Sequence, residues 1–187
     1  FAQEKGQLIF EYLRLIKELD PKAFLIENVP GLIKIDNGKT VNDLKEVLET
    51  LGYHVKVKIL EASNFGVPQF RSRAFIIGNK VNSDFQFPEN IFSDNKVGCA
   101  QALAFIDQST LNNETRIHKE ESIERYRKLL FGEREKKGRV DRLNPNLPSK
   151  TVIAGGSSGG GRSHLHPYSV RTISVRECAR LQTFPDN

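Results

Sequence analysis

The sequence predicts an α/β protein in which part of an open sheet is followed by a smaller, irregular lobe. Two observations carry this prediction. Helical and strand patterns alternate from residue 7 to residue 78, and one strand pattern is a short continuous apolar run. After Gly78 the pattern dissolves into segments rich in Asn, Ser, Asp and Gln, which are typical of irregular structure.

The first 78 residues contain patterns of five helices and strands. Apolar residues at helical spacing predict a helix over 7–19, which Asp20-Pro21 ends. The run Ala23–Ile26 predicts a strand that is buried on both faces. A helix over 41–51 that stops at Gly52, a strand over 53–60 and a strand over 74–78 follow.

The second lobe has fewer regular elements. A charged stretch near 119–137 predicts a helix, and 150–154 has the pattern of a strand. Ser174 and Glu177 are three residues apart at the start of a further helix, which is the pattern of a capping box. We therefore expect residues 1–79 to form the sheet domain, 80–165 the irregular lobe, and 166–187 a helical segment that returns toward the sheet domain.

The length, hydrophobic content and charge of the chain limit the classes of function that it can have. The chain has 187 residues and 38% hydrophobic content, which suits one core plus a smaller lobe. Its formal net charge of +5 is concentrated in residues 116–142, where ten Lys/Arg face six Asp/Glu. Four arginines face one glutamate over 162–180. This field suits a polyanion such as DNA, although solvated charged helices explain the same pattern.

Length and cysteine usage indicate the setting. No apolar run approaches a membrane span, and Cys99 and Cys178 lack the spacing of metal ligands, so a reducing, intracellular location is expected. The chain contains no Met, which indicates a piece of something longer.

Two motifs place polar groups at strand ends. Glu27-Asn28-Val29 follows the apolar run, where open α/β sheets bind ligands. A carboxyl group buried there would keep its proton and could donate a hydrogen bond to a ring nitrogen, whereas the simpler alternative is a turn that ends the strand. In Gln69-x-Arg71-x-Arg73, the two arginines point to the same side of an extended chain.

Together these stretches resemble the C5-cytosine DNA methyltransferases, and the resemblance spans Gly6 to Asp186. The two motifs match the family's Glu-Asn-Val and Gln-x-Arg-x-Arg motifs, in order. Residues 171–186 resemble the helix that docks the target-recognition domain onto the catalytic domain. The resemblance implies a partial Rossmann-like, S-adenosylmethionine-dependent methyltransferase sheet and methyl transfer to carbon 5 of a flipped cytosine.

The resemblance also implies residue roles. Glu27 would hold N3 and the exocyclic amine of cytosine, and Arg73 would hold O2, with Arg71 beside it. Leu8 falls where the family packs a leucine near the cofactor, and a core leucine is an equal alternative. The other assignments are Asn28, Val29 and Gln69 as support of the base pocket, and Arg176, Glu177, Arg180 and Gln182 as residues of the docking helix.

The family pattern is incomplete at the reacting atom. No Pro-Cys-Gln nucleophile is present, and the positions of Cys99 and Cys178 match no family nucleophile. The nucleophile would fall upstream of Phe1, and the last family motif would fall beyond Asp186. We therefore expect the chain to be inactive alone.

The glycine-rich stretch 156–163 has the spacing of a phosphate-binding loop, but Arg162 replaces the required lysine. In the family, this region belongs to the target-recognition domain. The expected DNA contacts are Thr151, Arg162, Ser163, His164 and His166, the last four more to phosphates than to bases.

The sequence thus favours part of a bacterial C5-cytosine methyltransferase of a restriction–modification system, cytoplasmic and associated with the nucleoid. Its expected partners are duplex DNA and a second polypeptide that carries the missing motifs. Two alternatives remain open: a DNA-binding protein without enzymatic activity, and one subunit of a naturally split enzyme.

Overall fold

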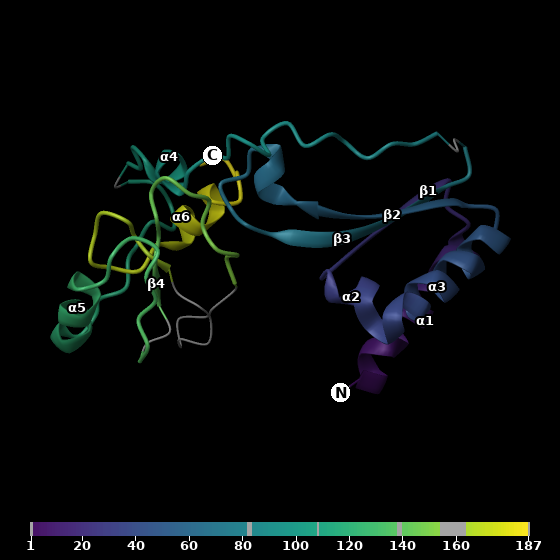
Figure 1. Ribbon diagram of the computed structural model, residues 1–187, viewed down its shortest axis with the longest axis horizontal. Helices are drawn as coiled ribbons and strands as arrows, with labels where there is room; N and C mark the ends of the chain where they lie inside the picture. Colours follow the sequence, from purple (N-terminus) through teal and green to yellow (C-terminus); the bar gives the residue numbers. More distant parts are fainter. Residues whose placement is uncertain (1, 82–83, 108, 138–139, 154–163, 187) are drawn as a thin grey trace. The chain divides into compact units, whose positions relative to one another are not determined.

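The computed structural model describes residues 2–81, 84–107, 109–137, 140–153 and 164–186 (Figure 1). The chain divides into two compact units. The sheet unit contains Phe1–Leu60 and Ser72–Glu89, and the C-terminal unit contains Glu61–Arg71 and Asn90–Asn187. The division therefore differs from the expected boundaries, because residues 61–71 and 166–187 belong to the same unit as the irregular lobe.

The sheet unit contains three α-helices, one 3-10 helix and one three-stranded sheet among its described residues. Its strands have the spatial order β1-β3-β2, and β1 pairs antiparallel with β3. The elements are α1 (Ala2–Leu19), β1 (Ala23–Asn28), α2 (Gly31–Lys34), the 3-10 helix η1 (Ile35–Gly38), α3 (Lys39–Thr50), β2 (His54–Glu61) and β3 (Ser72–Asn79). Each of the five elements predicted for this part of the chain is confirmed in type.

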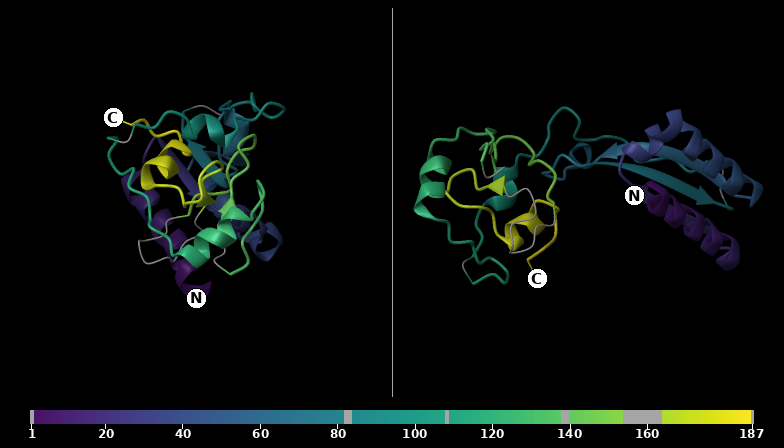
Figure 2. Two further views of the ribbon diagram at one scale, coloured as in Figure 1. Left: turned by 90° about the vertical axis from the view of Figure 1, so that its left-hand side faces the viewer. Right: turned by 90° about the horizontal axis from the view of Figure 1, so that it is seen from below.

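The core of this unit lies between one face of the sheet and the helices α1 and α3, which lie on the same side (Figure 1, Figure 2). Ile16 of α1 and Leu48 of α3 are buried against Phe24 and Ile76 of the sheet. The partners Phe24 and Gly78 share this face, and a Cβ atom at Gly78 would lie 2.3 Å from the Phe24 ring. Packing of the Phe24 ring therefore requires glycine at position 78.

The opposite face of β1 is open. Leu25 is 52% exposed, whereas Phe24 is 8% exposed. The prediction of a strand buried on both faces is therefore wrong for this structure, because α1 and α3 cover one face only.

The C-terminal unit contains short elements joined by long loops. They are the 3-10 helix η2 (Ala62–Phe65), α4 (Cys99–Leu103), α5 (Glu120–Arg127), β4 (Asp141–Arg142), β5 (His164–Leu165) and α6 (Val175–Arg180). β4 and β5 pair in parallel. Two small apolar clusters hold the unit, one around Cys99 and Leu181 and the other around Tyr126 and Leu165.

Two predictions about this unit need correction. The helix expected over 119–137 ends at Arg127, and the chain then turns through Gly132, whose φ of 81° suits glycine. Residues 150–153 form no strand; the pairing nearby is an isolated bridge between Gln69 and Ser149. The glycine-rich stretch 155–161 lies outside the described residues. The capping box of Ser174 and Glu177 at α6 is confirmed.

Candidate functional site

The site in the sheet unit is built on the register between β1 and β3. Glu27 is the partner of Phe75, so its side chain shares a face with Phe75 and with Arg73, two residues earlier in β3. The Arg73 Nε donates to the Glu27 Oε1 at 2.8 Å. This pair lies on the open face of the sheet. The residues of β1 that alternate with Glu27 point to the opposite face, where the core lies; they are Phe24, Ile26 and Asn28.

The pair is fixed from both strands. The Nη1 of Arg73 donates to the Ser72 carbonyl at 2.8 Å, which fixes the orientation of the guanidinium. The Oδ1 of Asn28 accepts the Val29 N–H at 2.8 Å, and the Val29 carbonyl accepts the Leu32 N–H at the start of α2. Asn28 and Val29 thus form the turn that ends β1 directly after Glu27.

The expected burial of Glu27 is not found. Its side chain is 43% exposed, whereas that of Arg73 is 20% exposed. An exposed carboxylate held by one arginine can accept hydrogen bonds, and the guanidinium offers further donors beside it. The pair therefore presents a hydrogen-bond acceptor and guanidinium donors side by side on the open face of the sheet.

Arg71 lies in the C-terminal unit, at the end of the loop 61–71. Its backbone N–H donates to the Glu61 carboxylate at 2.6 Å, and its carbonyl accepts the Ala62 N–H at 3.0 Å. These contacts close the base of the loop. The expected place of the Arg71 guanidinium beside Arg73 stays a prediction.

Gln69 is fully buried and braces the C-terminal unit. Its Nε2 donates to the Leu181 carbonyl at 3.4 Å, and its Oε1 accepts the Val152 N–H at 3.1 Å. The amide is therefore engaged at both ends within the protein. Its expected support of the base pocket can act only through the segments that it holds.

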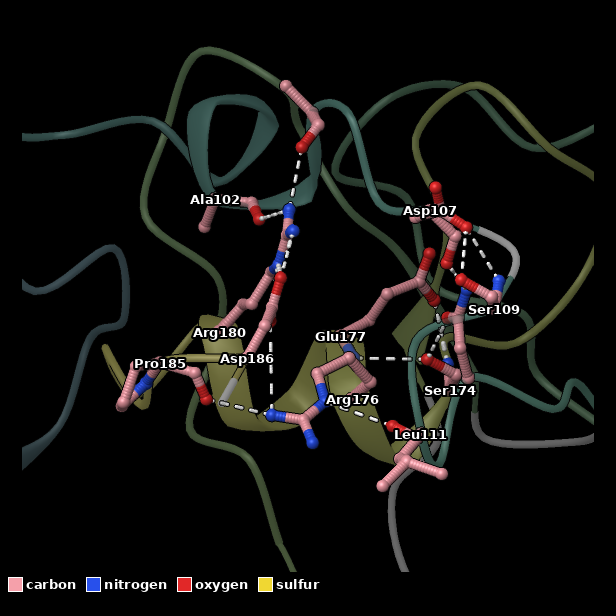
Figure 3. A network of polar contacts seen from close by, with 12 residues as sticks. Ala102, Asp107, Ser109, Leu111, Ser174, Arg176, Glu177, Arg180, Pro185 and Asp186 are labelled. Carbon is pink, nitrogen blue, oxygen red and sulfur yellow. Dashed lines mark hydrogen bonds and ion pairs between the residues drawn. The ribbon is translucent and has the colours of Figure 1, made fainter.

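Polar contacts of α6 within the C-terminal unit are shown in Figure 3. Arg176 donates to the carbonyls of Leu111 and Pro185, at 3.0 and 2.8 Å. Arg180 donates to the Ala104 carbonyl at 2.6 Å and pairs with Asp186. These contacts hold α6 to the distant carbonyls of Ala104 and Leu111 and to the chain directly after the helix. The docking of this lobe onto the catalytic domain stays a prediction.

Glu177 and Gln182 complete the helix. Both oxygens of Glu177 accept from the Arg171 guanidinium at 2.8 Å, and Oε2 also accepts the Ser174 N–H. Burial acts to raise the pKa of Glu177, but the hydrogen bonds from Arg171 and Ser174 lower it on balance. Gln182 donates to the Cys178 carbonyl at 3.4 Å.

The expected DNA contacts differ in accessibility. His164 is 2% exposed, so its ring cannot reach a phosphate in this conformation, and its predicted contact is not supported. The Thr151 hydroxyl donates to the Phe70 carbonyl at 2.7 Å. His166 is partly exposed, and its contact stays a prediction. Arg162 and Ser163 lie outside the described residues.

The exposure of Leu8 and the pKa values of the two cysteine thiols bear on two further predictions. Leu8 is 72% exposed, so the alternative of a core leucine is wrong, while its contact with the cofactor stays a prediction. Burial raises the pKa of the Cys99 thiol and of the Cys178 thiol to about 11. Thiols with such a pKa are poor nucleophiles at neutral pH, as the sequence predicts for both.

The sequence did not mark Arg142 as a structural residue. Its guanidinium is buried and donates to the carbonyls of Tyr126 and Pro167, both at 2.9 Å. It lies in a run of charged residues, where composition alone favours a solvated side chain. Its structural role is evident only from the fold, in which the guanidinium is buried against other segments.

Neither a metal site nor a membrane-spanning helix is found among the described residues. No group of three or more His, Cys, Asp or Glu side chains is placed to hold a metal ion. Within the same ranges, no helix has the length and apolar character that a membrane span requires.

The fold is a mixed α/β domain that carries the Glu27–Arg73 pair on the open face of its sheet, and comparison with known proteins gives its family. The family model for C-5 cytosine-specific DNA methylase matches residues 1–187. The chain therefore belongs to the C-5 cytosine-specific DNA methylase family.

Curated proteins with similar sequences support the same family. Type II methyltransferase M.NgoFVII of Neisseria gonorrhoeae is 33% identical over 98% of this chain and 55% of its own length. Type II methyltransferase M1.HphI of Haemophilus parahaemolyticus is 34% identical over 100% of this chain and 54% of its own length. The chain thus spans about half the length of these curated relatives.

Solved structures share the fold. A DNA modification methyltransferase encoded within a prophage (E. coli) superposes with a TM-score of 0.77 at 26% identity, covering 98% of this chain and 65% of that one. The Dnmt2 methyltransferase of S. pombe gives a TM-score of 0.61 at 18% identity, covering 99% of this chain and 62% of its own, a likeness of fold alone. The fold is consistent with part of a Rossmann-like methyltransferase domain.

Proposed function

We propose that this chain is the base-binding and target-recognition portion of a DNA (cytosine-5-)-methyltransferase of a restriction–modification system. The observation that carries the proposal is the ion pair of Glu27 and Arg73 at the end of β1. Both residues lie in stretches of sequence that resemble motifs of the C5-cytosine DNA methyltransferases, the family to which the chain belongs.

The chemistry of the pair suits one edge of cytosine. A base inside a duplex cannot be reached by an enzyme, so it must be flipped into a pocket that replaces its pairing partners. The Glu27 carboxyl group can accept from the exocyclic amine and, when protonated, donate to N3. Arg73 can donate to O2. Protonation of N3 makes carbon 6 more electrophilic toward a thiolate.

The nucleophile and most of the cofactor site come from a polypeptide segment with the upstream family motifs. Cys99 and Cys178 do not supply the thiolate, because burial keeps both thiols protonated. The described residues offer Leu8 as an exposed apolar contact for S-adenosylmethionine, which supplies the methyl group when bound. Association with the nucleoid follows from DNA as the substrate.

The substitution Glu27→Gln tests the proposal in the chain combined with the polypeptide that carries the upstream motifs. Glutamine keeps the size of the side chain but cannot donate a proton to N3, so methyl transfer should fall at least about 100-fold. Binding of duplex DNA should be unchanged. The matched control is Glu46→Gln, on the exposed side of α3.

Labelled methyl transfer and DNA binding are measured on the same preparations. Equal loss of both in the Glu27→Gln variant, or a loss equal to that of Glu46→Gln, would contradict the role of Glu27. A non-catalytic DNA-binding protein is the second candidate, favoured by the basic segment 116–142. That candidate predicts no methyl transfer from any combination.

A further inference from the structure

Residues 61–71 form a loop, which we call the arginine loop, and hydrogen bonds of Glu61 and Arg71 close its base. The Glu61 Oε1 accepts the Arg71 N–H at 2.6 Å. The Ala62 N–H donates to the Arg71 carbonyl at 3.0 Å. Both backbone polar groups of Arg71 are therefore held at the start of the loop, and the Glu61 carboxylate fixes the backbone from which the Arg71 guanidinium projects.

The same carboxylate oxygen also contacts the first turn of the arginine loop. The backbone N–H and the hydroxyl of Ser63 both donate to the Glu61 Oε1 at 3.5 Å. Ser63 is 0% exposed, so these long hydrogen bonds are shielded from water. One oxygen of Glu61 therefore joins the first turn of the loop to its last residue.

A segment that belongs to none of the motifs, residues 92–96, packs on the arginine loop within the same unit. The Phe92 N–H donates to the Asn64 carbonyl at 3.0 Å. The Phe92 ring also covers Gly66, where an added Cβ would lie 3.0 Å from the ring. Backbone pairing and the packing of one ring therefore fix the middle of the loop.

The ammonium group of Lys96 completes this contact. Its Nζ donates to the Asn64 Oδ1 at 2.5 Å and to the Ser63 Oγ at 3.3 Å, and it lies 6.0 Å from the centroid of the Phe70 ring. The Ser63 hydroxyl thus accepts from Lys96 and donates to Glu61. One buried hydroxyl therefore links the ammonium group of Lys96 to the Glu61 carboxylate.

The conformation of the arginine loop depends on these polar contacts. Neither apolar cluster of the C-terminal unit includes a residue of the loop. The buried polar residues of the loop are Ser63 and Gln69. Hydrogen bonds are directional, so this network can hold the backbone of Arg71 in one position, and its loss should leave the backbone less well placed.

We propose that Glu61 and Lys96 are positioning residues for methyl transfer, which fix the arginine loop, and through it Arg71, without touching the base. The proposal rests on the proposed function, since it takes the expected role of Arg71 at the base pocket. It adds two residues that none of the motifs includes. Because a positioning residue acts by holding geometry, its loss should lower kcat more than it changes KM.

Steady-state methyl transfer by the chain combined with the polypeptide that carries the upstream motifs tests the proposal. Glu61→Ala removes the acceptor, so kcat should fall about 10-fold or more, while KM for duplex DNA should change by less than about twofold. Glu61→Gln keeps an acceptor oxygen at the same place and should retain the original kcat, unlike Glu27→Gln.

The ammonium group is tested in the same assay. Lys96→Met keeps the length of the side chain but removes its hydrogen-bond donors, so it should lower kcat as Glu61→Ala does. The matched control is Lys22→Met, at an exposed position of the sheet unit, which should leave kcat unchanged.

Four results would overturn the positioning role. Original values of kcat in Glu61→Ala and Lys96→Met would exclude it while the proposed function stands. A raised KM with unchanged kcat would indicate a binding contact instead. A loss in Glu61→Gln as large as in Glu61→Ala would show that the charge of Glu61, and not its acceptor oxygen, is required. A mixture with the original chain that transfers no methyl groups would overturn both the proposed function and this role.

Amide hydrogen exchange of the chain alone is a second measurement, which does not require methyl transfer. In Glu61→Ala the Arg71 N–H should exchange at least about 10-fold faster, because it loses a hydrogen bond to a charged group. The Leu143 N–H, which donates to the Leu165 carbonyl at 3.1 Å in the same unit, should exchange as before. Unchanged exchange at Arg71, or equal acceleration at both amides, would contradict a local role of Glu61.

Discussion

The ion pair of Glu27 and Arg73 depends on strand register, so single residues of β1 and β3 decide whether the site exists. A slip of one residue would move Glu27 to the face covered by α1 and α3. Phe24 opposes that slip, because its ring packs on the face of Gly78 and against Tyr53, with ring centroids 5.1 Å apart. Packing on one face therefore sets the chemistry on the other.

The substitution Gly78→Ala tests this link. The new Cβ would lie 2.3 Å from the Phe24 ring, so the ring must move, and we expect a loss of about 1 to 3 kcal/mol in the free energy of unfolding. Gly31→Ala is the control, because no atom lies within 4 Å of its added Cβ. Urea unfolding measures both. Equal effects at the two positions would contradict the packing argument.

Residue patterns could predict the site in part. The spacing of Arg71 and Arg73, and the place of Glu27 after an apolar run, pointed to the strand ends. The exposure of Leu25 and the internal hydrogen bonds of Gln69 could not be predicted, because both depend on which segments cover them. A run of apolar letters does not say how many faces of its sheet are covered.

At the scale of elements, α6 is short and takes its stability from its first turn and from Glu177. Ser174 accepts the Glu177 N–H at 3.0 Å, and the Glu177 carboxylate accepts from Ser174 and Arg171. The capping box was predicted because its residues are local in sequence. The carbonyl partners of Arg176 and Arg180 at Leu111 and Ala104 lie more than 60 residues earlier in the chain and left no local signal.

Two substitutions separate these contributions. Ser174→Ala removes the cap and should cost about 1 kcal/mol of the free energy of unfolding. Glu177→Gln keeps a capping side chain but loses the ion pair with Arg171, a buried charged contact, and should cost about 2 to 4 kcal/mol. Denaturant unfolding measures both losses, and the control is Glu124→Gln at an exposed position of α5. A larger loss from Ser174→Ala than from Glu177→Gln would contradict this order.

At the scale of the whole molecule, the C-terminal unit has small cores and many buried polar groups, so its stability should depend on pH. Burial lowers the pKa of His118, His164 and His166 from the ordinary value. Below a pH of about 6.5 the unfolded chain then binds more protons at these residues than the folded chain does. The free energy of unfolding should therefore rise with pH between about 5 and 6.5.

Urea unfolding at several pH values measures this slope. The variant His164→Gln should have a smaller slope than the original chain, because it lacks one of the three imidazoles. The lowered pKa values of Glu177, Asp107 and Asp186 act in a separate window, since their contribution is lost only as pH falls through the acidic range. A free energy of unfolding that falls as pH rises from 5 to about 6.5 would contradict the argument.

The division into two units depends in part on contacts that could not be predicted from the sequence. Composition predicted an irregular, basic lobe after the sheet, and short elements with two small apolar clusters are found there. The membership of residues 61–71 in that unit was missed, because Gln69 and Phe70 contact segments near Ser149, far along the chain. Pairing across such sequence distances leaves no local pattern.

Transfer of labelled methyl groups from S-adenosylmethionine to duplex DNA tests the central claim most directly. The chain is assayed alone and with the polypeptide that carries the upstream family motifs. We predict transfer in the mixture, none from either part alone, and loss of transfer with Glu27→Gln. A mixture that binds DNA but transfers no methyl groups would contradict the claim and favour the non-catalytic alternative.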